Sequence, residues 1–266
     1  MQDWVSCLVF FLVAITCYGV ALVLRKMSIM DLIWSLGLGA GATLIFLEAS
    51  SENANSLRAY LALGLILAWS LRLSGHLFFN RILKEDEDAR YKRLIEHAGR
   101  YWKAVFLLLF LTQVVLVYVF LIPIRTAIES PVLAFAWHDW LALCIGILAL
   151  IGETISDDQL KQFSSDAENE GKVCKTGFWR YSRHPNYFFE WLFWWAFVFF
   201  SLGSSSFFLS FIGPIAMYCF LRYISGIPFA ELSSLERRGE AYRRYQKETS
   251  IFFPRIPKLK MKNDGA

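Results

Sequence analysis

Seven apolar stretches of membrane-spanning length dominate this 266-residue chain. A helix needs about 20 mostly apolar residues to cross the hydrocarbon core of a bilayer. The sequence therefore predicts an all-α polytopic membrane protein with seven transmembrane helices. The expected helices are Trp4–Leu24, Ile29–Ala49, Leu57–Phe79, Ala104–Ile124, Trp137–Ile155, Tyr187–Leu202 and Phe207–Ser225.

The composition agrees with a membrane protein, since 56% of the residues are hydrophobic and 17% are aromatic. The mean hydropathy is +0.41. No connection between the apolar stretches is long enough for a separate soluble domain, and we see no internal repeat. We therefore expect a single membrane domain over residues 1–266.

Basic residues set the expected orientation, because Lys and Arg accumulate in the cytosolic connections of membrane proteins. Of the 27 Lys and Arg residues, 24 lie in four segments, namely Arg25–Lys26, Arg81–Lys103, Lys161–Arg183 and Arg222 onward. With seven helices, these four segments are expected on the same side of the membrane. The exceptions are Arg58, Arg72 and Arg125. This bias predicts an N-terminus outside and a C-terminus in the cytosol.

The stretch GKVCKTGFWRYSRHPNYFFEWLFWW, residues 171–195, begins as a basic loop and becomes an apolar aromatic run. Proline is tolerated in the first turn of a helix, so Pro185 marks the expected start of the sixth helix. Asn186 and Glu190 lie four residues apart and share one face of that helix. A carboxylate just inside hydrocarbon is costly and is a candidate for function, although polar side chains also join membrane helices. The pattern suggests a site for an anionic ligand with polar groups.

Glu153 and Asp157 form a second pair at the end of the fifth helix. Neighbouring carboxylates repel unless a donor or a cation separates them. Ligand hydroxyls, an amide or an arginine would do so, and a helix emerging into water is the structural alternative.

The second and third helices contain further polar groups, namely Asp31, Glu48, Arg72 and His76, which could form structural ion pairs or hold a ligand. The sequence contains no Gly-rich phosphate loop, zinc-ligand spacing or soluble hydrolase triad. We expect neither a metal nor a nucleic-acid partner. A dinucleotide would have to be held by side chains at the cytosolic ends of helices.

The motif GFWRYSRHPNYFFEW follows GETISDDQLKQF and precedes GIPFAE, AYRRYQ and FFPRIPK. Together these segments, over approximately Trp137–Lys258, resemble a bacterial member of the steroid 5α-reductase family of membrane reductases. The Arg-His-Pro-x-Tyr run alone is not specific, because isoprenylcysteine carboxyl methyltransferases carry a similar one. The resemblance implies a seven-helix fold that binds NADPH on the cytosolic side and reduces the C=C bond of an enone.

On that pattern, residues 137–258 would form the NADPH site, with Asp157, Asn186 and Glu190 at hydroxyls and amides. Arg180 and Arg183 would lie toward the phosphates. Glu153 departs from the pattern, because the eukaryotic reductases place an asparagine there. The expected cofactor-binding set is Glu153, Asp157, Lys161, Arg180, Tyr181, Arg183, His184, Asn186, Tyr187, Glu190, Glu231, Tyr242 and Arg243.

The resemblance also implies a Tyr–Glu pair that polarises the substrate ketone. Glu48 is the candidate glutamate, but the matching part of the third helix offers Trp69, so Tyr91 in the adjacent loop stands in for the tyrosine. The helices of residues 1–126 would form the substrate pocket with Trp34, Glu48, Trp69 and Arg72.

The sequence thus predicts an NADPH-dependent enone reductase of the bacterial inner membrane. Its substrate would be a 3-oxo-Δ4 steroid or similar apolar lipid that enters from the bilayer among membrane lipids. One alternative is an S-adenosylmethionine-dependent membrane methyltransferase, suggested by Arg183-His184-Pro185 and Glu231. Another is a lipid-binding or transport protein, although no inverted repeat supports it.

Overall fold

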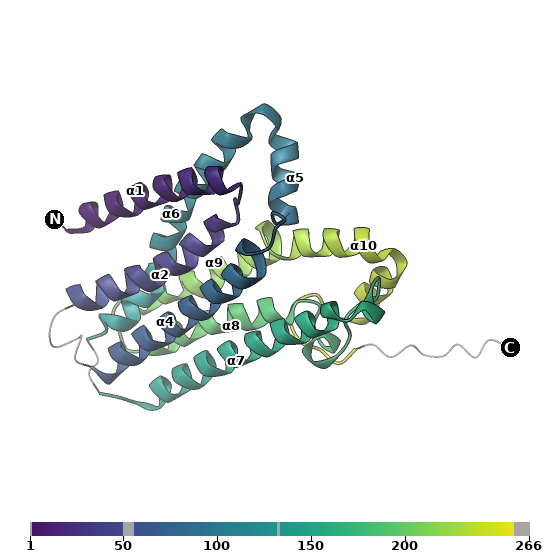
Figure 1. Cartoon of the computed structure of the whole chain (residues 1–266). Coiled ribbons are helices and arrows are strands. Elements are labelled where there is room, and N and C mark those ends of the chain that lie inside the picture. Colours follow the sequence, from purple (N-terminus) through teal and green to yellow (C-terminus); the bar gives the residue numbers. More distant parts are fainter. Residues whose placement is uncertain (1, 50–55, 132–133, 258–266) are drawn as a thin grey trace. The chain divides into compact units, whose positions relative to one another are not determined.

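The computed structural model describes residues 2–49, 56–131 and 134–257, which form helices joined by turns and loops (Figure 1). These ranges contain no strand; Ser182 and Ser250 make an isolated β-bridge. Within the same ranges, six helices are long and apolar enough to cross a membrane. The prediction of an all-α, multi-pass membrane protein is therefore confirmed.

The predicted sixth membrane helix is the short α8 (Pro185–Phe200), with 16 residues. A helix of this length extends about 24 Å, which is less than the ~30 Å hydrocarbon core. The seven-helix count therefore remains a prediction. Pro185 is the first residue of α8, as the tolerance of proline in a first helical turn predicts.

The chain divides into two compact units. The first unit comprises Met1–Asp139 and Phe197–Gly213, and the second comprises Trp140–Ala196 and Pro214–Ala266.

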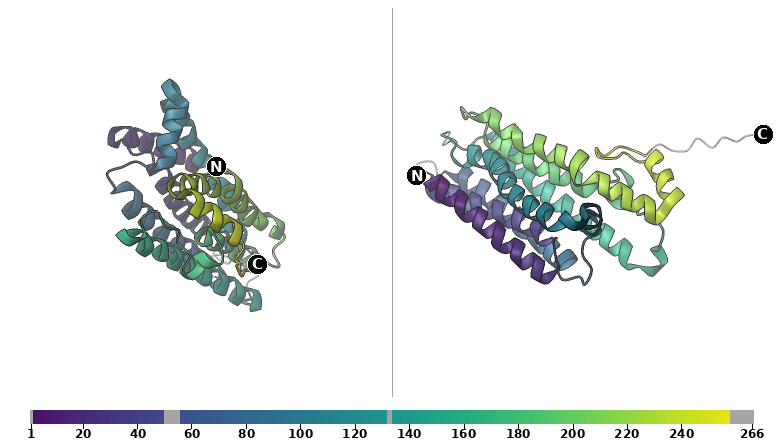
Figure 2. Two further views of the ribbon diagram at one scale, coloured as in Figure 1. Left: turned by 90° about the vertical axis from the view of Figure 1, so that its right-hand side faces the viewer. Right: turned by 90° about the horizontal axis from the view of Figure 1, so that it is seen from above.

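The first unit contains α1 (Gln2–Leu24), α2 (Ile29–Glu48), α4 (Leu57–Leu77), α5 (Ala89–Ala98) and α6 (Trp102–Ile128). Helix α6 packs against α1, α2 and α4, and α2 also packs against α4, an arrangement that Figure 2 shows from two sides. Small residues of α2 permit this approach. A Cβ added at Gly39 would lie 2.6 Å from Ser70 Oγ, and one at Gly41 would lie 2.5 Å from a methyl carbon of Leu121. Larger residues would push these helices apart.

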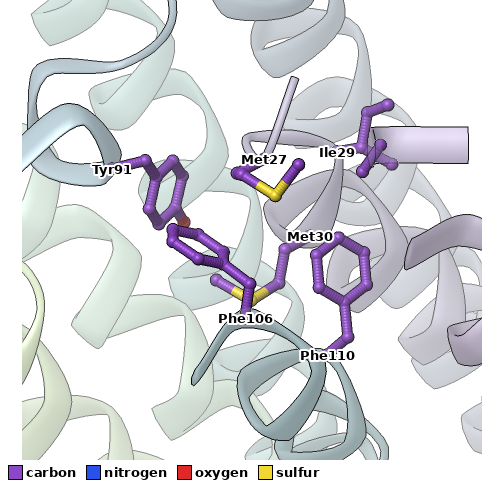
Figure 3. Close-up of a cluster of buried hydrophobic side chains, with 7 residues drawn as sticks. Met27, Ile29, Met30, Tyr91, Phe106 and Phe110 are labelled. Atoms are coloured by element: carbon purple, nitrogen blue, oxygen red, sulfur yellow. The ribbon is translucent and has the colours of Figure 1, made fainter. Parts of the chain in front are cut away.

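A cluster of buried sulfur and aromatic side chains fixes one end of these helices (Figure 3). Met27 and Met30, at the turn into α2, pack with Phe106 and Phe110 of α6. Tyr91 of the short α5 lies edge-to-face on Phe106, with ring centroids 5.7 Å apart. Apolar packing thus holds α5 against α6 despite the many charges around it.

The first turns of α4 and of α7 (Trp137–Ser165) are joined by a buried ion pair. Arg58 donates from Nε and Nη2 to the two carboxylate oxygens of Asp139, and both side chains are at most 2% exposed. Ser130 and the backbone N–H of Ala136 complete the hydrogen bonds. Arg58 is therefore neutralised inside the protein and does not act as a free surface cation.

The second unit contains α7 from Trp140 onward, α8 as far as Ala196, α9 (Ile212–Cys219) from Pro214 onward, and α10 (Ile227–Glu248). Helix α10 bends sharply at Gly239, where φ is 50° and ψ is −124° (Figure 1). Residues with a Cβ rarely adopt a positive φ of this kind. The bend folds the last turns of α10 back toward its start.

Candidate functional site

Arg183, in the loop before α8, is buried in the second unit and forms hydrogen bonds with α10 and its C-cap. Its Nε and Nη2 donate to Glu231 Oε1 at 2.9 Å and Oε2 at 3.1 Å. Its Nη1 donates to the carbonyl oxygens of Gln246 and Thr249, each at 2.9 Å. One bond on Nε, one on Nη2 and two on Nη1 use four of the five guanidinium N–H groups. In this arrangement, Arg183 binds the tail, and its expected role near a phosphate stays a prediction.

The carboxylate of Glu231 also accepts hydrogen bonds from three other side chains. They come from His184 Nε2 at 2.9 Å, from the Tyr242 hydroxyl at 2.8 Å and from Gln246 Nε2. With the two Arg183 bonds, five hydrogen bonds reach a group with about four lone-pair sites. Glu231 therefore has no acceptor capacity left for a ligand, and this Glu231 cluster joins the loop to α10.

Backbone hydrogen bonds reinforce the same junction. The N–H of Arg183 donates to the carbonyl oxygen of Ser250 at 2.8 Å, and that of Arg255 donates to Tyr181 at 3.0 Å. Ser182 Oγ donates to the carbonyl oxygen of Phe252 at 2.8 Å. Residues 181–184 are thus held to the chain after α10, which fixes the start of α8.

Helices α7 and α8 meet where the sequence places two polar pairs. Asn186 Nδ2 donates to Asp157 Oδ1 at 3.0 Å. A Cβ at Gly152 would lie 2.4 Å from the ring of Phe189. Position 157 thus faces 186 and position 152 faces 189, so the two helices are antiparallel.

Because the helices are antiparallel, the carboxylates of Glu153 and Glu190 lie at the same height along the α7–α8 contact. Glu153 precedes Asp157 by about one turn, and Glu190 follows Asn186 by about one turn. Glu153 is 5% exposed and Glu190 is 6% exposed. Trp194 Nε1 donates to Glu190 Oε1 at 3.4 Å. The structure therefore collects three carboxylates and one amide along the α7–α8 contact, of which two carboxylates are buried.

The remaining residues of the expected cofactor set lie outside this contact. Tyr187 stacks on His184, with ring centroids 5.5 Å apart and planes 9° apart. Arg243 forms an exposed ion pair with Glu240 at 3.0 Å. The side chains of Lys161, Arg180 and Tyr181 are exposed. Of the basic residues proposed for phosphates, Arg180 is accessible and Arg183 is not.

In the first unit, Asp31 at the start of α2 is the centre of a charged cluster. Arg81 Nη1 and Arg90 Nη2 donate to Asp31 Oδ2 at 2.6 Å and 2.9 Å. The Tyr91 hydroxyl donates to Asp31 Oδ1 at 2.6 Å. Burial would raise the pKa of Asp88, but hydrogen bonds and charge from Arg90, with the charge of Arg81, lower it. The charged loop after α4 is therefore tied to the start of α2.

Trp34 lies one turn further along α2 in an aromatic environment. Its ring meets Trp69 and Phe120 edge-on, with centroids 5.4 Å and 5.6 Å away. Trp69 is fully buried and Arg72 is half-buried in the same helix, α4. The indole N–H of Trp34 is buried and has no hydrogen-bond partner within the described residues. An unsatisfied buried donor costs about 1–3 kcal/mol, so this N–H is suited to a ligand acceptor.

Glu48 lies at the opposite end of α2 from Asp31 and its partner Tyr91. Seventeen residues separate Glu48 from Asp31 along one helix, or roughly 25 Å at 1.5 Å per residue. The fourteen residues from Trp34 to Glu48 correspond to about 21 Å. The expected Glu48–Tyr91 pair therefore does not form, and Glu48 is not grouped with Trp34 and Trp69.

Several participants in these clusters were absent from the expected site. Arg81 and Arg90 surround Asp31, and Gln246 binds Glu231. The acidic Asp31 in an apolar stretch, followed by basic residues at the cytosolic boundary, was a usable signal for the first cluster. Gln246 gave none. Among the described residues, no group of three or more His, Cys, Asp or Glu side chains could hold a metal ion.

The Glu231 cluster predicts a pH dependence of stability. Burial lowers the pKa of His184, and this effect outweighs the hydrogen bond that His184 donates to Glu231, which raises the pKa. Below the unfolded pKa of about 6.5, the unfolded chain therefore binds a proton that the folded chain resists. Stability should be retained above this pH and fall below it, as thermal unfolding in detergent between pH 8 and pH 5 would reveal.

The His184→Gln variant keeps an N–H donor but cannot titrate, so its loss of stability toward acid should be smaller. His97→Gln, at an exposed position, is the matched control and should follow the wild type. An equal acid response in all three proteins would contradict the role assigned to His184.

Comparisons with known proteins place the chain in a family. Residues 17–249 match the family described as "Protein of unknown function (DUF1295)". An uncharacterized protein of Schizosaccharomyces pombe, C594.04c, is 24% identical over 282 aligned positions, covering 95% of this chain and 79% of the yeast protein. No solved structure matches. Because the family match covers most of the sequence, the chain belongs to the DUF1295 family.

Proposed function

We propose that this protein is an NADPH-dependent reductase that reduces the C=C bond of an apolar α,β-unsaturated ketone. In this proposal it has seven transmembrane helices, an external N-terminus and a cytosolic C-terminus, in the cytoplasmic membrane of a bacterium. The substrate class is a 3-oxo-Δ4 steroid or a similar flat lipid. The resemblance of residues 137–258 to membrane reductases suggested this activity.

The observation that carries the proposal is the polar contact between α7 and α8. Asp157 and Asn186 are hydrogen-bonded, and the buried carboxylates of Glu153 and Glu190 lie one turn further along. A carboxylate has about four lone-pair sites and can accept hydrogen bonds from several donors at once. A nucleotide offers ribose hydroxyls and a carboxamide N–H₂ group, which are donors of this kind. The residues present therefore fit the polar part of a dinucleotide.

We infer that Asp157, Asn186 and Glu190 would hold these donors and orient the nucleotide, with Glu153 beside them. When bound, the dinucleotide supplies a hydride. The accessible Arg180 is the candidate contact for a phosphate, because Arg183 is engaged by Glu231. Arginine pairs with phosphate in a bidentate, charge-assisted manner, which favours NADPH over NADH.

For the ketone, the proposal uses the aromatic group around Trp34 in the first unit. Aromatic rings suit a flat apolar molecule, and the buried Trp34 N–H can donate to a carbonyl oxygen as negative charge develops there. Tyr91 is a weaker candidate, since its one hydroxyl proton is donated to Asp31. Glu48 is too distant from both to assist.

The alternative functions have less support. A methyltransferase site built on Arg183, His184 and Glu231 would need polar groups that these residues already use with one another. A transport path through Asp31 would have to displace Arg81 and Arg90. The methyltransferase alternative does not account for the carboxylates along the α7–α8 contact.

The proposed orientation can be tested with reporter fusions after residue 266. Since basic residues accumulate in the cytosol, we expect a fluorescent protein fused there to fold and an alkaline phosphatase to be inactive. An active phosphatase at this position would reverse the proposed topology.

The nucleotide site can be tested by titrating NADPH into the detergent-solubilised protein in a calorimeter. Glu190→Gln should weaken binding by about 10- to 100-fold, because a hydrogen bond to a charged group contributes about 1.5–3 kcal/mol. Wild-type protein should bind NADPH more tightly than NADH.

Asp158→Asn, which alters an exposed neighbour of Asp157, is the control and should bind as the wild type does. Unchanged affinity in Glu190→Gln would remove that residue from the site. Absence of NADPH binding by wild-type protein would reject the proposed function.

The donor to the ketone can be tested with Trp34→Phe, which keeps an aromatic ring and removes the N–H. Reduction of a test enone such as progesterone should slow by about 10²-fold or more, while NADPH affinity stays unchanged. Trp4→Phe changes an exposed tryptophan and should retain wild-type rates. Wild-type turnover by a folded Trp34→Phe protein would show that the polarising donor is elsewhere.

A further inference from the structure

A cavity of about 240 Å³ lies in the first unit among α1, α2 and α6. It is distinct from the Asp31 and Trp34 groups, because it is lined by the opposite end of α2. Ligand sites for whole drug-sized molecules occupy ~300–1,000 Å³, so this cavity suits only part of a larger molecule. Its lining consists of Phe10, Gly41, Leu44, Ile45, Glu48, Tyr118, Leu121, Ile122 and Arg125.

The cavity has an apolar interior and a charged mouth. Glu48 is the last residue of α2, and Arg125 lies in the last turn of α6. Gly41 and Tyr118 lie seven residues before these charges on the same helix faces, or about 10 Å deeper. Phe10 closes the inner end by meeting Tyr118 edge-to-face, with ring centroids 5.8 Å apart.

The mouth contains one charge of each sign, Glu48 and Arg125. Arg125 forms an ion pair with Glu129 of its own helix at 3.5 Å. Glu48 therefore lies in the lining together with an arginine whose charge Glu129 already balances in part. This balance favours a ligand that presents both a cation and an anion and disfavours one that is purely anionic.

The surroundings of the cavity indicate a lipid. The helices that line it expose apolar side chains, including Val9 and Val13 of α1 and Leu44 and Leu47 of α2, which are 51%, 45%, 40% and 72% exposed. In a membrane helix such surface faces acyl chains. A ligand that enters here therefore comes from the bilayer, with its head group at the membrane boundary where α2 and α6 end.

We propose that this cavity binds a zwitterionic phospholipid with a primary ammonium, such as phosphatidylethanolamine. The ammonium donates to Glu48, the phosphate lies at Arg125, and the first part of one acyl chain fills the space between Phe10, Leu44 and Leu121. Phosphatidylcholine presents a quaternary ammonium without N–H donors, and phosphatidylglycerol carries a net negative charge. Both therefore match the mouth less well.

The proposal can be tested by reconstituting the full chain with each of these three lipids and measuring thermal stabilisation and retained lipid by native mass spectrometry. Wild-type protein should prefer phosphatidylethanolamine over phosphatidylcholine and phosphatidylglycerol. Glu48→Gln should bind it about tenfold more weakly and lose the preference over phosphatidylcholine, because one charge-assisted hydrogen bond is removed.

Two further variants separate the parts of the site. Arg125→Gln should weaken both zwitterionic lipids alike, since both carry the phosphate. Leu44→Trp should fill the cavity and reduce binding of every phospholipid. Glu85→Gln removes one exposed carboxylate outside the cavity and should behave as the wild type does.

Three results would overturn the proposal. They are equal binding of the three lipids by wild-type protein, a preference that survives in Glu48→Gln, and displacement of the lipid by progesterone, which would make the cavity part of a ketone site. If Leu44→Trp fails to fold, the lipid preferences of wild-type protein and Glu48→Gln still test the proposal. The lipid site does not depend on reductase activity, because the nucleotide residues belong to the second unit.

Discussion

The carboxylate of Glu231 is the interaction on which the second unit depends. It binds Arg183 and His184 from the loop before α8, and it binds Tyr242 and Gln246 from the far end of its own helix. A buried guanidinium without this partner would be an uncompensated charge, which typically costs 3–5 kcal/mol. The start of α8, and with it the position of Asn186 against Asp157, is therefore fixed by a residue 48 positions later in the chain than Arg183.

The helices and the α7–α8 contact could be predicted from sequence because their signals are local. Apolar runs of sufficient length give the membrane helices, and four-residue spacing places Asn186 with Glu190 and Glu153 with Asp157 on shared faces. Their contact across two helices follows once the connection of residues 166–184 returns the chain and makes the helices antiparallel. Because α8 is shorter than the hydrocarbon core, however, the expected count of seven membrane-spanning helices stays a prediction.

The partners of the polar residues were harder to predict, because they depend on contacts distant in sequence. Nothing local in Arg183 distinguishes an arginine that binds phosphate from one that binds Glu231. The expected Glu48–Tyr91 pair failed for a reason that the sequence did contain. The orientation predicted from basic residues places the end of α2 outside and the loop with Tyr91 inside, and 17 residues of helix separate Glu48 from Asp31.

The bend at Gly239 affects the order in which parts of the second unit can fold during synthesis. In a straight helix, the eleven residues from Glu231 to Tyr242 would extend about 16 Å, yet their side chains are hydrogen-bonded at 2.8 Å. The bend makes this contact possible, and the carbonyl oxygens of Gln246 and Thr249 complete it only after synthesis has reached Thr249. During insertion into the membrane, Arg183 must therefore stay hydrated at the interface, and the second unit can close only when its last helix has left the ribosome.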